Sequence, residues 1–239
     1  MEQNKTGKYF KYAIGEIILV VIGILIALQI NNWNENNKLE AKTQDYYQQL
    51  LEDLKKDKAF SKNTIAKFET QREMYQNYLK KFSESKLNVK TMYYDLLGLN
   101  MESFAINFNT STIESLKNSG EITLIPPHLR NKLIDLRRQQ EKITQDEIVD
   151  NAGKSGVLER LSMILGSFSL YERLENQTEI KAFLNIEENA NEIIIGLEAI
   201  QFWMNFSEIK SIKLLKELEL EIDAVEVLIR KELKNDKIL

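Results

Sequence analysis

The sequence contains no cysteine and only one histidine, His128. These absences exclude cysteine nucleophiles, disulfide bonds, thiolate zinc sites and paired-histidine metal sites within one chain. A serine-histidine-acid arrangement would have to use His128, which directly follows Pro126 and Pro127 and has no nucleophile-elbow sequence to accompany it. Glycine-rich phosphate-binding motifs are also missing. We therefore predict that His128 is a surface residue at the start of a helix, and that the protein is not an enzyme and holds no cofactor or metal.

Proline and glycine are also scarce. The 239 residues include two prolines and nine glycines, few for a chain of this length, which favours long helices over a β fold rich in turns. Apolar residues make up 43% of the chain and charged residues 28%, which is enough to bury a core, so we predict an all-α fold. The net charge of -4 comes from intermixed acids and bases, so the sequence predicts no positively charged surface and no nucleic-acid partner.

One long hydrophobic segment lies near the N-terminus. Residues 9–30 are apolar except for Lys11, Glu16 and Gln29 and a few weakly polar positions. As a helix, this segment would be about 33 Å long, close to the roughly 30 Å thickness of a bilayer core. It is therefore predicted to be a transmembrane helix, with the lipid bilayer as its first partner.

The hydrophobic segment also divides the chain. We predict a cytoplasmic tail at residues 1–8, a transmembrane helix at 9–33 and an extracytoplasmic helical domain at 34–239, because slightly more lysines precede the segment than follow it. A secretory signal peptide is the alternative, since the same lysines would form its basic leader. No small-residue cleavage site follows Leu28, which favours the anchor.

The far end of the segment is rich in amides and closes with a tryptophan. Gln29, Asn31 and Asn32 are suited to hydrogen bonding in the headgroup layer, and the amphipathic ring of Trp33 is typical of a membrane interface. These four residues are predicted to anchor the helix at its far interface.

Glu16 is the one acid inside the segment, and three interpretations of it stay open. An ionised acid at the centre of a bilayer costs about 2.5–3.5 kcal/mol, but Glu16 lies only about 10 Å from the start of the segment. Its carboxylate can therefore extend back toward the cytoplasmic surface. The other two interpretations are a hydrogen-bonded acid between neighbouring helices and an element of a proton or ion path.

Small residues in the segment indicate a packing face. Gly23 and Ala27 form a small-xxx-small pair, and Gly15 lies eight residues before Gly23, so the three are expected near one helical face. Small residues let helix backbones approach closely inside a membrane, so Gly15, Glu16, Gly23 and Ala27 are the candidate membrane packing or polar site, and homo-oligomerisation is expected.

The transmembrane helix is predicted to continue into a long helix at about 35–84, and a helical bundle is predicted to follow at about 88–239. A heptad register fits the long helix, although polar positions interrupt it, which favours packing against its own chain over a dimeric coiled coil. The register positions are Tyr47, Leu51, Leu54, Lys58, Ser61, Ile65, Phe68, Arg72, Tyr75, Leu79 and Phe82.

An elaborate corner follows at residues 111–127. Ser111 is predicted to cap a short helix with Glu114 completing a capping box, and Gly120 to end that helix in the left-handed conformation. The run 121–125 is predicted to be extended, and the Pro126-Pro127 pair to start the next helix.

Four further features are predicted for the C-terminal half. Residues 151–156, NAGKSG, form the best candidate hinge, and separate helices are expected at about 187–205 and after it. Four sets of apolar residues at helical spacing are expected to form the core: Leu129, Leu133, Leu136 and Ile143; Val157, Leu161, Ile164, Phe168 and Tyr171; Ala190, Ile193, Leu197, Ile200 and Met204; and Leu215, Leu218, Ile222, Val225 and Ile229. Phe202, Trp203 and Phe206 are a possible partner surface or a further part of that core.

Two blocks of the sequence resemble a known family. KYAIGEIILVVIGILIALQINNWNE, within residues 8–36, is similar to the N-terminal signature of a large, uncharacterised membrane-anchored family of Bacteroidota, and STIESLKNSGEITLI, within 104–136, resembles its second block. The resemblance implies a Gram-negative inner-membrane anchor with a periplasmic helical body. No activity or catalytic residue comes with it.

Two functions from different classes remain in view. The leading hypothesis is a membrane-anchored periplasmic helical protein that acts by self-association or by binding another envelope protein, as a scaffold or accessory subunit. The alternative is a proton-conducting, ion-conducting or transport-complex subunit that uses Glu16. An enzyme built on acidic pairs such as Asp146-Glu147 or Glu187-Glu188 is disfavoured, because adjacent side chains on a helix diverge by about 100°.

Overall fold

The described part of the protein consists of helices and the loops that connect them. The computed structural model describes residues 5–167, 169–185 and 188–235, and these ranges contain no β-strand. Its helices are α1 (Lys5–Glu84), α2 (Val89–Leu97), α3 (Ser111–Asn118), the 3-10 helix η1 (Glu121–Leu124), α4 (Pro127–Leu165), α5 (Leu170–Arg173), α6 (Thr178–Phe183) and α7 (Ala190–Asn235). The predicted all-α fold is confirmed for these residues. Residues 1–4 of the predicted tail and Glu187 of the second acidic pair lie outside the described residues.

Helix α1 is a single helix of 80 residues that runs from the hydrophobic segment into the body. It contains no proline that would remove a backbone hydrogen bond, and at about 1.5 Å per residue it is about 120 Å long. Residues 13–42 are all exposed, and α1 becomes partly buried only from Thr43 onward. The predicted continuation of one helix from the hydrophobic segment to Glu84 is confirmed.

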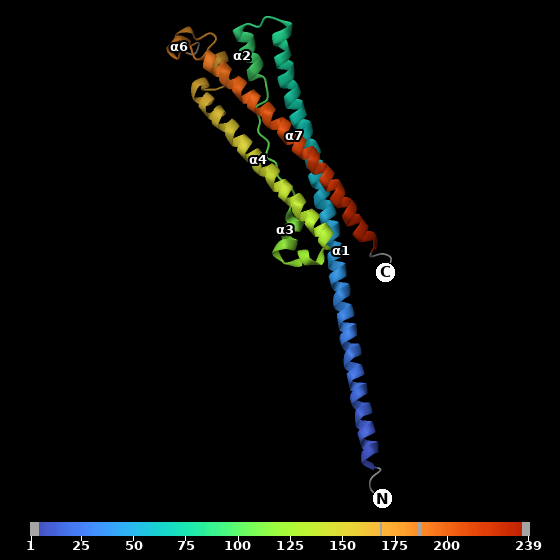
Figure 1. The fold of residues 1–239 in the computed structure, drawn as a ribbon. Coiled ribbons are helices and arrows are strands. Elements are labelled where there is room, and N and C mark those ends of the chain that lie inside the picture. Colours follow the sequence, from blue (N-terminus) through green and yellow to red (C-terminus); the bar gives the residue numbers. More distant parts are fainter. Residues whose placement is uncertain (1–4, 168, 186–187, 236–239) are drawn as a thin grey trace.

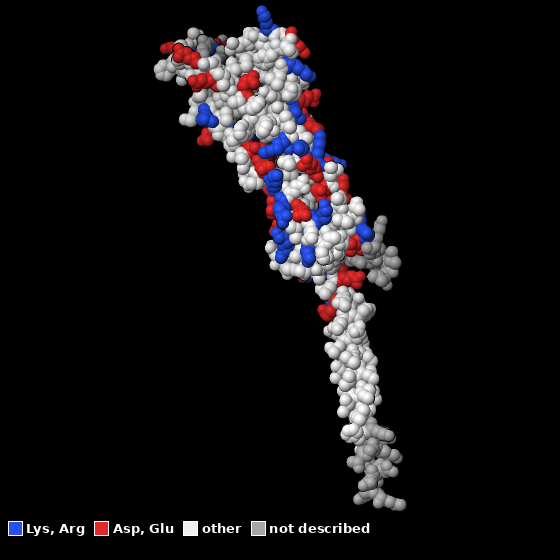
Figure 2. Space-filling model, viewed as in Figure 1, with Lys and Arg blue, Asp and Glu red and all other residues white. Residues whose placement is uncertain are grey.

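The N-terminal half of α1 stands alone, and the other helices gather around its second half (Figure 1). On the face shown in Figure 2, the projecting rod is almost free of charged side chains, whereas acidic and basic residues mix over the body. By length and composition, α1 contains a segment able to cross a membrane, and none of that segment is buried. A signal sequence near an N-terminus would share both properties.

Three long helices form the body. α1 and α4 run away from the hydrophobic segment, and α7 returns between them (Figure 1). α7 packs against both α1 and α4. The short helices α2 and α6 lie at the distal end of this bundle, and α3 lies at its proximal end, nearer the hydrophobic segment.

The core of the bundle has two hydrophobic clusters. The proximal cluster is built from α1, α3, α4 and α7, with members such as Leu54, Leu116, Leu129, Leu218 and Ile222. The distal cluster includes Tyr75, Leu96, Leu161, Leu197 and Ile200. Most of the predicted core positions of α4 and α7 are buried, which confirms them: Leu129, Leu133, Leu136, Ile143, Leu161, Ile193, Leu197, Ile200, Met204, Leu215, Leu218, Ile222, Val225 and Ile229. Ile164 is exposed, so its prediction as a core residue is wrong, and Val157 and Ala190 are half-buried. Phe168 and the side chain of Tyr171 lie outside the described residues.

A buried polar layer separates the two clusters. It consists of Gln71 from α1, Glu147 and Lys154 from α4, and Glu208 and Ser211 from α7, all of them buried. On α1, α4 and α7, these residues lie along the sequence between the buried residues of the proximal cluster and those of the distal cluster. The bundle is therefore two apolar cores joined through a charged middle.

Helix α7 is one helix of 46 residues, Ala190–Asn235. The prediction of two helices, at about 187–205 and beyond, is wrong. After Gly196 the helix contains neither glycine nor proline, so no residue favours a break near 205.

The predicted hinge at residues 151–156 is also wrong, because α4 passes through it without interruption. Gly153 instead allows Trp203 of α7 to pack closely against α4. A Cβ atom at this position would lie 2.9 Å from Cζ2 of Trp203, so only glycine leaves room for the indole ring.

The corner at 111–127 matches the sequence in part. Gly120 has the predicted left-handed conformation, with φ of 75°, and Pro127 is the first residue of α4, as predicted. Residues 121–124 form η1, so the prediction of an extended run is wrong. The turn at Gly120 brings Glu121 back to α1, where its carboxylate accepts hydrogen bonds from Lys42 and Tyr46.

The buried face of α1 is rotated relative to the predicted register. Tyr47, Leu54, Ser61, Ile65, Phe68 and Tyr75 are buried as expected. Leu79 and Phe82 are exposed, and the remaining buried positions are Leu50, Asp57, Thr64, Gln71 and Tyr78. Asp57 and Gln71 face the interior because they bind the backbone of a loop that crosses the bundle.

Candidate functional site

The loop that crosses the bundle is residues 99–110, here called the strap, which has no regular secondary structure. Its side chains alternate, with Phe104, Ile106 and Phe108 turned at least partly into the core and the residues between them exposed. This is the period of a β-strand, yet no neighbouring strand supplies hydrogen bonds to it within the described residues. The helices must satisfy its buried carbonyl groups instead.

Side chains from all three long helices bind the strap. Asn151 Nδ2 donates to the Phe104 carbonyl at 3.1 Å, and Gln201 Nε2 donates to the Asn100 carbonyl at 3.3 Å. The Glu102 carbonyl accepts from Lys154 Nζ at 3.3 Å and, more weakly, from Gln71 Nε2 at 3.5 Å. These contacts explain why Gln71, Lys154 and Gln201 are buried in a helical core.

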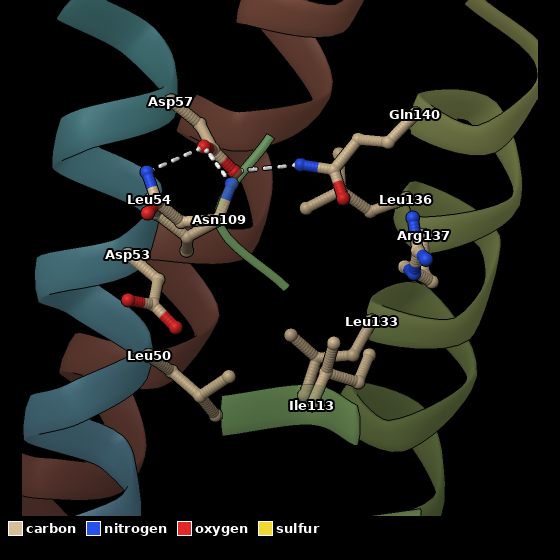
Figure 3. A pocket seen from close by; sticks show the side chains of 10 residues that line it. All are labelled: Leu50, Asp53, Leu54, Asp57, Asn109, Ile113, Leu133, Leu136, Arg137 and Gln140. Carbon is tan, nitrogen blue, oxygen red and sulfur yellow. Dashed lines mark hydrogen bonds between the residues drawn. The ribbon is translucent and has the colours of Figure 1, made fainter. Parts of the chain in front are cut away.

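Asp57 of α1 is the strongest attachment of the strap. It is 1% exposed, and its Oδ1 accepts hydrogen bonds from Asn109 N at 2.6 Å and Asn109 Nδ2 at 3.1 Å. Its Oδ2 accepts from Gln140 Nε2 of α4 at 2.7 Å (Figure 3). Burial raises the pKa of the Asp57 carboxyl, and the hydrogen bonds from Asn109 and Gln140 partly oppose that rise.

Asp53, one turn before Asp57, caps α3. Its Oδ2 accepts from Thr112 Oγ1 at 2.7 Å and Thr112 N at 3.3 Å. The predicted capping box of Ser111 and Glu114 is wrong, since no side chain of α3 caps its own helix. Glu114 instead accepts a hydrogen bond from Arg137 Nε of α4 at 2.9 Å. Asp53 of α1 therefore supplies the helix cap that was predicted for Ser111.

A small cavity lies among these residues (Figure 3). Asp53, Asp57, Asn109, Arg137 and Gln140 line it together with apolar side chains of α1, α3 and α4. Its volume is about 20 Å³. That is about the space of one water molecule and far below the roughly 300 Å³ of the smallest usual ligand pockets, so the carboxylates here hold the strap and do not form a substrate site.

Burial shifts the pKa values of both acids and of the lysine in the polar layer. Burial raises the pKa of Glu208 to about 7, although Lys154 and Arg72 oppose the rise. Burial also raises the pKa of Glu147, whose Oε2 accepts a hydrogen bond from Ser211 at 2.8 Å, and lowers the pKa of Lys154. The layer thus buries two acids around one lysine that also holds the strap.

Helix α7 carries a second apolar face that points away from the core. Its residues follow steps of four and three: Ile195, Ala199, Phe202, Phe206 and Ile209, here called the α7 stripe. All five are exposed, Ile195, Phe202 and Phe206 by 64–68%. A helix that is apolar on all sides is normally covered on all sides, so this half of α7 has the composition of a helix with a further neighbour.

Trp203 lies beside the α7 stripe and is held in place by α4. Its Nε1 donates to the Asp150 carbonyl at 3.2 Å, and its ring lies against Gly153. Of the three predicted partner-surface residues, Phe202 and Phe206 belong to the stripe, and Trp203 is a fixed aromatic at its border. The structure places all three at the surface and adds Ile195, Ala199 and Ile209 to them.

One family model matches the chain, over residues 16–154, and its description is "Family of unknown function (DUF6090)". The match covers more than half of the chain. This protein belongs to the DUF6090 family. No curated protein and no solved structure matches the chain.

The DUF6090 match includes most of the hydrophobic segment, the strap and both carboxylates that fix the corner, Asp53 and Asp57. It ends at Lys154, so Glu208 and the α7 stripe lie beyond it. An uncharacterised family, as the sequence blocks indicated, is therefore confirmed, and the family brings no activity to this chain.

The membrane residues predicted for this DUF6090 member all lie on the projecting part of α1. Gly15, Glu16, Gly23 and Ala27 are exposed, and nothing lies within 4 Å of a Cβ atom built on either glycine. At about 100° per residue, Glu16 shares one side of the helix with Gly23 and Ala27, to within about 20°. Gly15 is rotated from Gly23 and Ala27 by about 80–120°, so the prediction that it shares their face is wrong. Packing through this face, and ion conduction by Glu16, stay predictions.

The interface residues lie at the end of the same segment. Gln29, Asn31, Asn32 and Trp33 are exposed on α1, and the helix stays exposed for nine further residues before the body begins. Their role in fixing the depth of the helix in a bilayer stays a prediction.

His128 lies in the first turn of α4, as predicted. Its side chain is 55% exposed, and Nε2 lies 3.3 Å from Glu232 Oε1. Among the described residues, no three acids or histidines gather in a way that could hold a metal ion. Asp146 and Glu147 diverge as expected, since Glu147 is buried and binds Ser211.

Sequence reasoning missed the residues that hold the strap. Asp53 and Asp57 were passed over because they lie outside the predicted apolar register, and Glu208 and Lys154 because each lies among ordinary surface-type residues. The available signal was the alternation of large apolar residues with small or polar ones in SFAINFN, residues 103–109, which marks a half-buried extended segment in a chain of helices.

Proposed function

We propose that this protein is a membrane-anchored helical scaffold or accessory subunit that acts by binding a protein through the α7 stripe. The observation that carries this proposal is the exposed apolar face of α7, next to a tryptophan whose ring is already fixed. Rigid aromatic side chains at a surface are efficient contact residues because little conformational entropy is lost when they are covered.

The geometry of α1 supports a protein partner over lipid. Arg72 Nε donates to Asn205 Oδ1 at 3.2 Å, and Tyr78 donates to Glu198, so the stripe lies beside residues 72–78 of α1. These residues follow Trp33 by about 40 positions, which is about 60 Å along a helix. The stripe is thus held far from the bilayer in which α1 is anchored.

The proposed compartment is the periplasm, with the anchor in the inner membrane and the N-terminus in the cytoplasm. The lysines before the segment and the resemblance of the two sequence blocks support this orientation. We expect Lys142→Cys, at an exposed position of α4, to react with a membrane-impermeant maleimide once the outer membrane is opened, and Lys8→Cys to react only after lysis. The native chain has no cysteine, so it gives no background. The reverse labelling pattern would contradict the orientation.

Binding through the stripe is tested by a photo-crosslinking amino acid at Phe202 in intact membranes. We expect one discrete adduct at this position. The matched control carries the same amino acid at Lys142, which is exposed outside the stripe and should give no discrete product. If the product at position 202 is no stronger than that at 142, the proposed function is wrong.

A further inference from the structure

We propose that the partner of the α7 stripe is the same stripe of a second copy of this chain, anchored in the same membrane. This inference rests on the proposed function and names the occupant of that surface. Three features carry it: the area of the stripe, the direction of α7 and the charges at its borders.

The stripe is too small to hold a free partner. Its exposed side chains and Trp203 present on the order of 400–500 Å² of apolar surface per copy. A stable complex of free proteins usually covers about 800 Å² per partner. A partner fixed in the same membrane needs less, because anchoring raises its effective concentration and sets its orientation in advance. A second copy meets this condition.

The direction of α7 suits a symmetric pair. Two copies anchored by α1 both send α7 back toward the membrane, so their stripes lie at the same height and run the same way. The residues of the α7 stripe follow steps of four and three from 195 to 209, a distance of about 21 Å along the helix. The line of contact that they would form with a second stripe is here called the seam. Across a two-fold axis, each seam residue lies near its own counterpart, and every side chain of this seam is apolar.

Two charged residues that border the stripe are already paired within the chain. Glu198 accepts a hydrogen bond from Tyr78, and Lys210 Nζ lies 2.6 Å from Asp150 Oδ2. Covering the stripe therefore leaves neither of these two charges without a partner. The same four-and-three pattern continues to Glu192 at one end and to Lys213 and Lys216 at the other, all exposed, so like charges limit the contact to residues 195–209.

Disulfide trapping tests the contact directly. Full-length Ala199→Cys and Ile209→Cys are each expressed in native membranes and mildly oxidised, with Lys142→Cys as the matched exposed control. We expect covalent dimers from the two seam variants at a yield about fivefold or more above the control, because residues on a two-fold axis meet their own counterparts. Equal yields from all three variants would indicate random collision and overturn the proposal.

A charge-pairing experiment tests whether position 206 faces itself. In the Ala199→Cys chain, Phe206→Glu alone and Phe206→Lys alone should each lower the dimer yield about fivefold or more, since like charges meet across the axis. Co-expression of the two variants with different tags should restore the mixed dimer. Low yield in the mixture, with the helix content of both variants unchanged, would contradict a self-facing seam.

The outcomes separate this inference from the proposed function. A Phe202 photo-adduct with the mass of a different protein, without seam disulfides, would overturn the second copy and keep the binding function. The absence of both adduct and disulfide would overturn both.

Discussion

Asp57→Ala is expected to lower the free energy of unfolding by about 3 kcal/mol or more. The substitution removes the acceptor of three hydrogen bonds, from Asn109 N, Asn109 Nδ2 and Gln140 Nε2. Each buried donor left without an acceptor costs about 1–3 kcal/mol, and only part of that cost returns if water enters the enlarged cavity. Denaturant unfolding of the full chain in detergent micelles, followed by circular dichroism, measures the loss.

Two matched variants show whether the acceptor causes this effect. Asp57→Asn keeps one oxygen for Asn109, and a rotated Gln140 amide can offer its own oxygen to the new NH₂ group, so we expect a loss of only about 1 kcal/mol. Glu52→Ala, at an exposed position of the same helix, should change stability by less than about 0.5 kcal/mol. If Asp57→Ala costs no more than Glu52→Ala, Asp57 does not hold the strap.

The stability of the body should fall as the pH rises from about 5 to 8. Burial raises the pKa of Glu208 from 4.5 to about 7, so between these values the unfolded chain has lost a proton that the folded chain keeps. Because the unfolded state binds fewer protons there, the free energy of unfolding decreases with rising pH, by on the order of 2–3 kcal/mol in all. The charged groups around Glu208 are Arg72 of α1 and Glu147 and Lys154 of α4.

Glu208→Gln tests this effect because glutamine resembles the protonated acid. We expect the variant to match the native chain near pH 5 and to exceed its free energy of unfolding by on the order of 2 kcal/mol at pH 8. Glu217→Gln, an exposed change on the same helix, should leave the pH profile unaltered. Taking the difference between variant and native chain cancels the contributions of groups that the two chains share. Parallel profiles for Glu208→Gln and the native chain would show that Glu208 ionises normally.

The sequence predicts where the helices of this fold lie better than it predicts what each helix packs against. The scarcity of proline and glycine indicates long helices, and Pro127 marks the start of α4, because both signals act within one turn of the chain. The buried face of α1 depends on the strap, whose partners lie up to 101 residues away in the sequence, as in the contact of Gln201 with Asn100. No local pattern in α1 shows that Asp57 and Gln71 turn inward, so the predicted register was rotated.

Glycine gave the most misleading signals. Gly153 suggested a hinge, but its role is to admit the Trp203 ring, and that role is visible only when α7 is in place. Gly120 was predicted correctly, because its left-handed conformation is a property of the turn itself. For the candidate site, the aromatic cluster at 202–206 was found from composition, whereas the α7 stripe required knowledge of which face of α7 the core covers.

The unbroken helix α1 also couples the orientation of the body to that of the hydrophobic segment. In the proposed membrane-anchored arrangement, a tilt of the hydrophobic segment in the bilayer is carried into the body without a joint, because one helix passes from the segment to Glu84. Glu84 lies about 77 Å beyond Trp33 along the helix, so a tilt of about 10° moves the distal end of the bundle by about 13 Å. A hydrophobic segment that is longer than the bilayer core tilts, so we expect bilayer thickness to influence how far apart two α7 stripes stand.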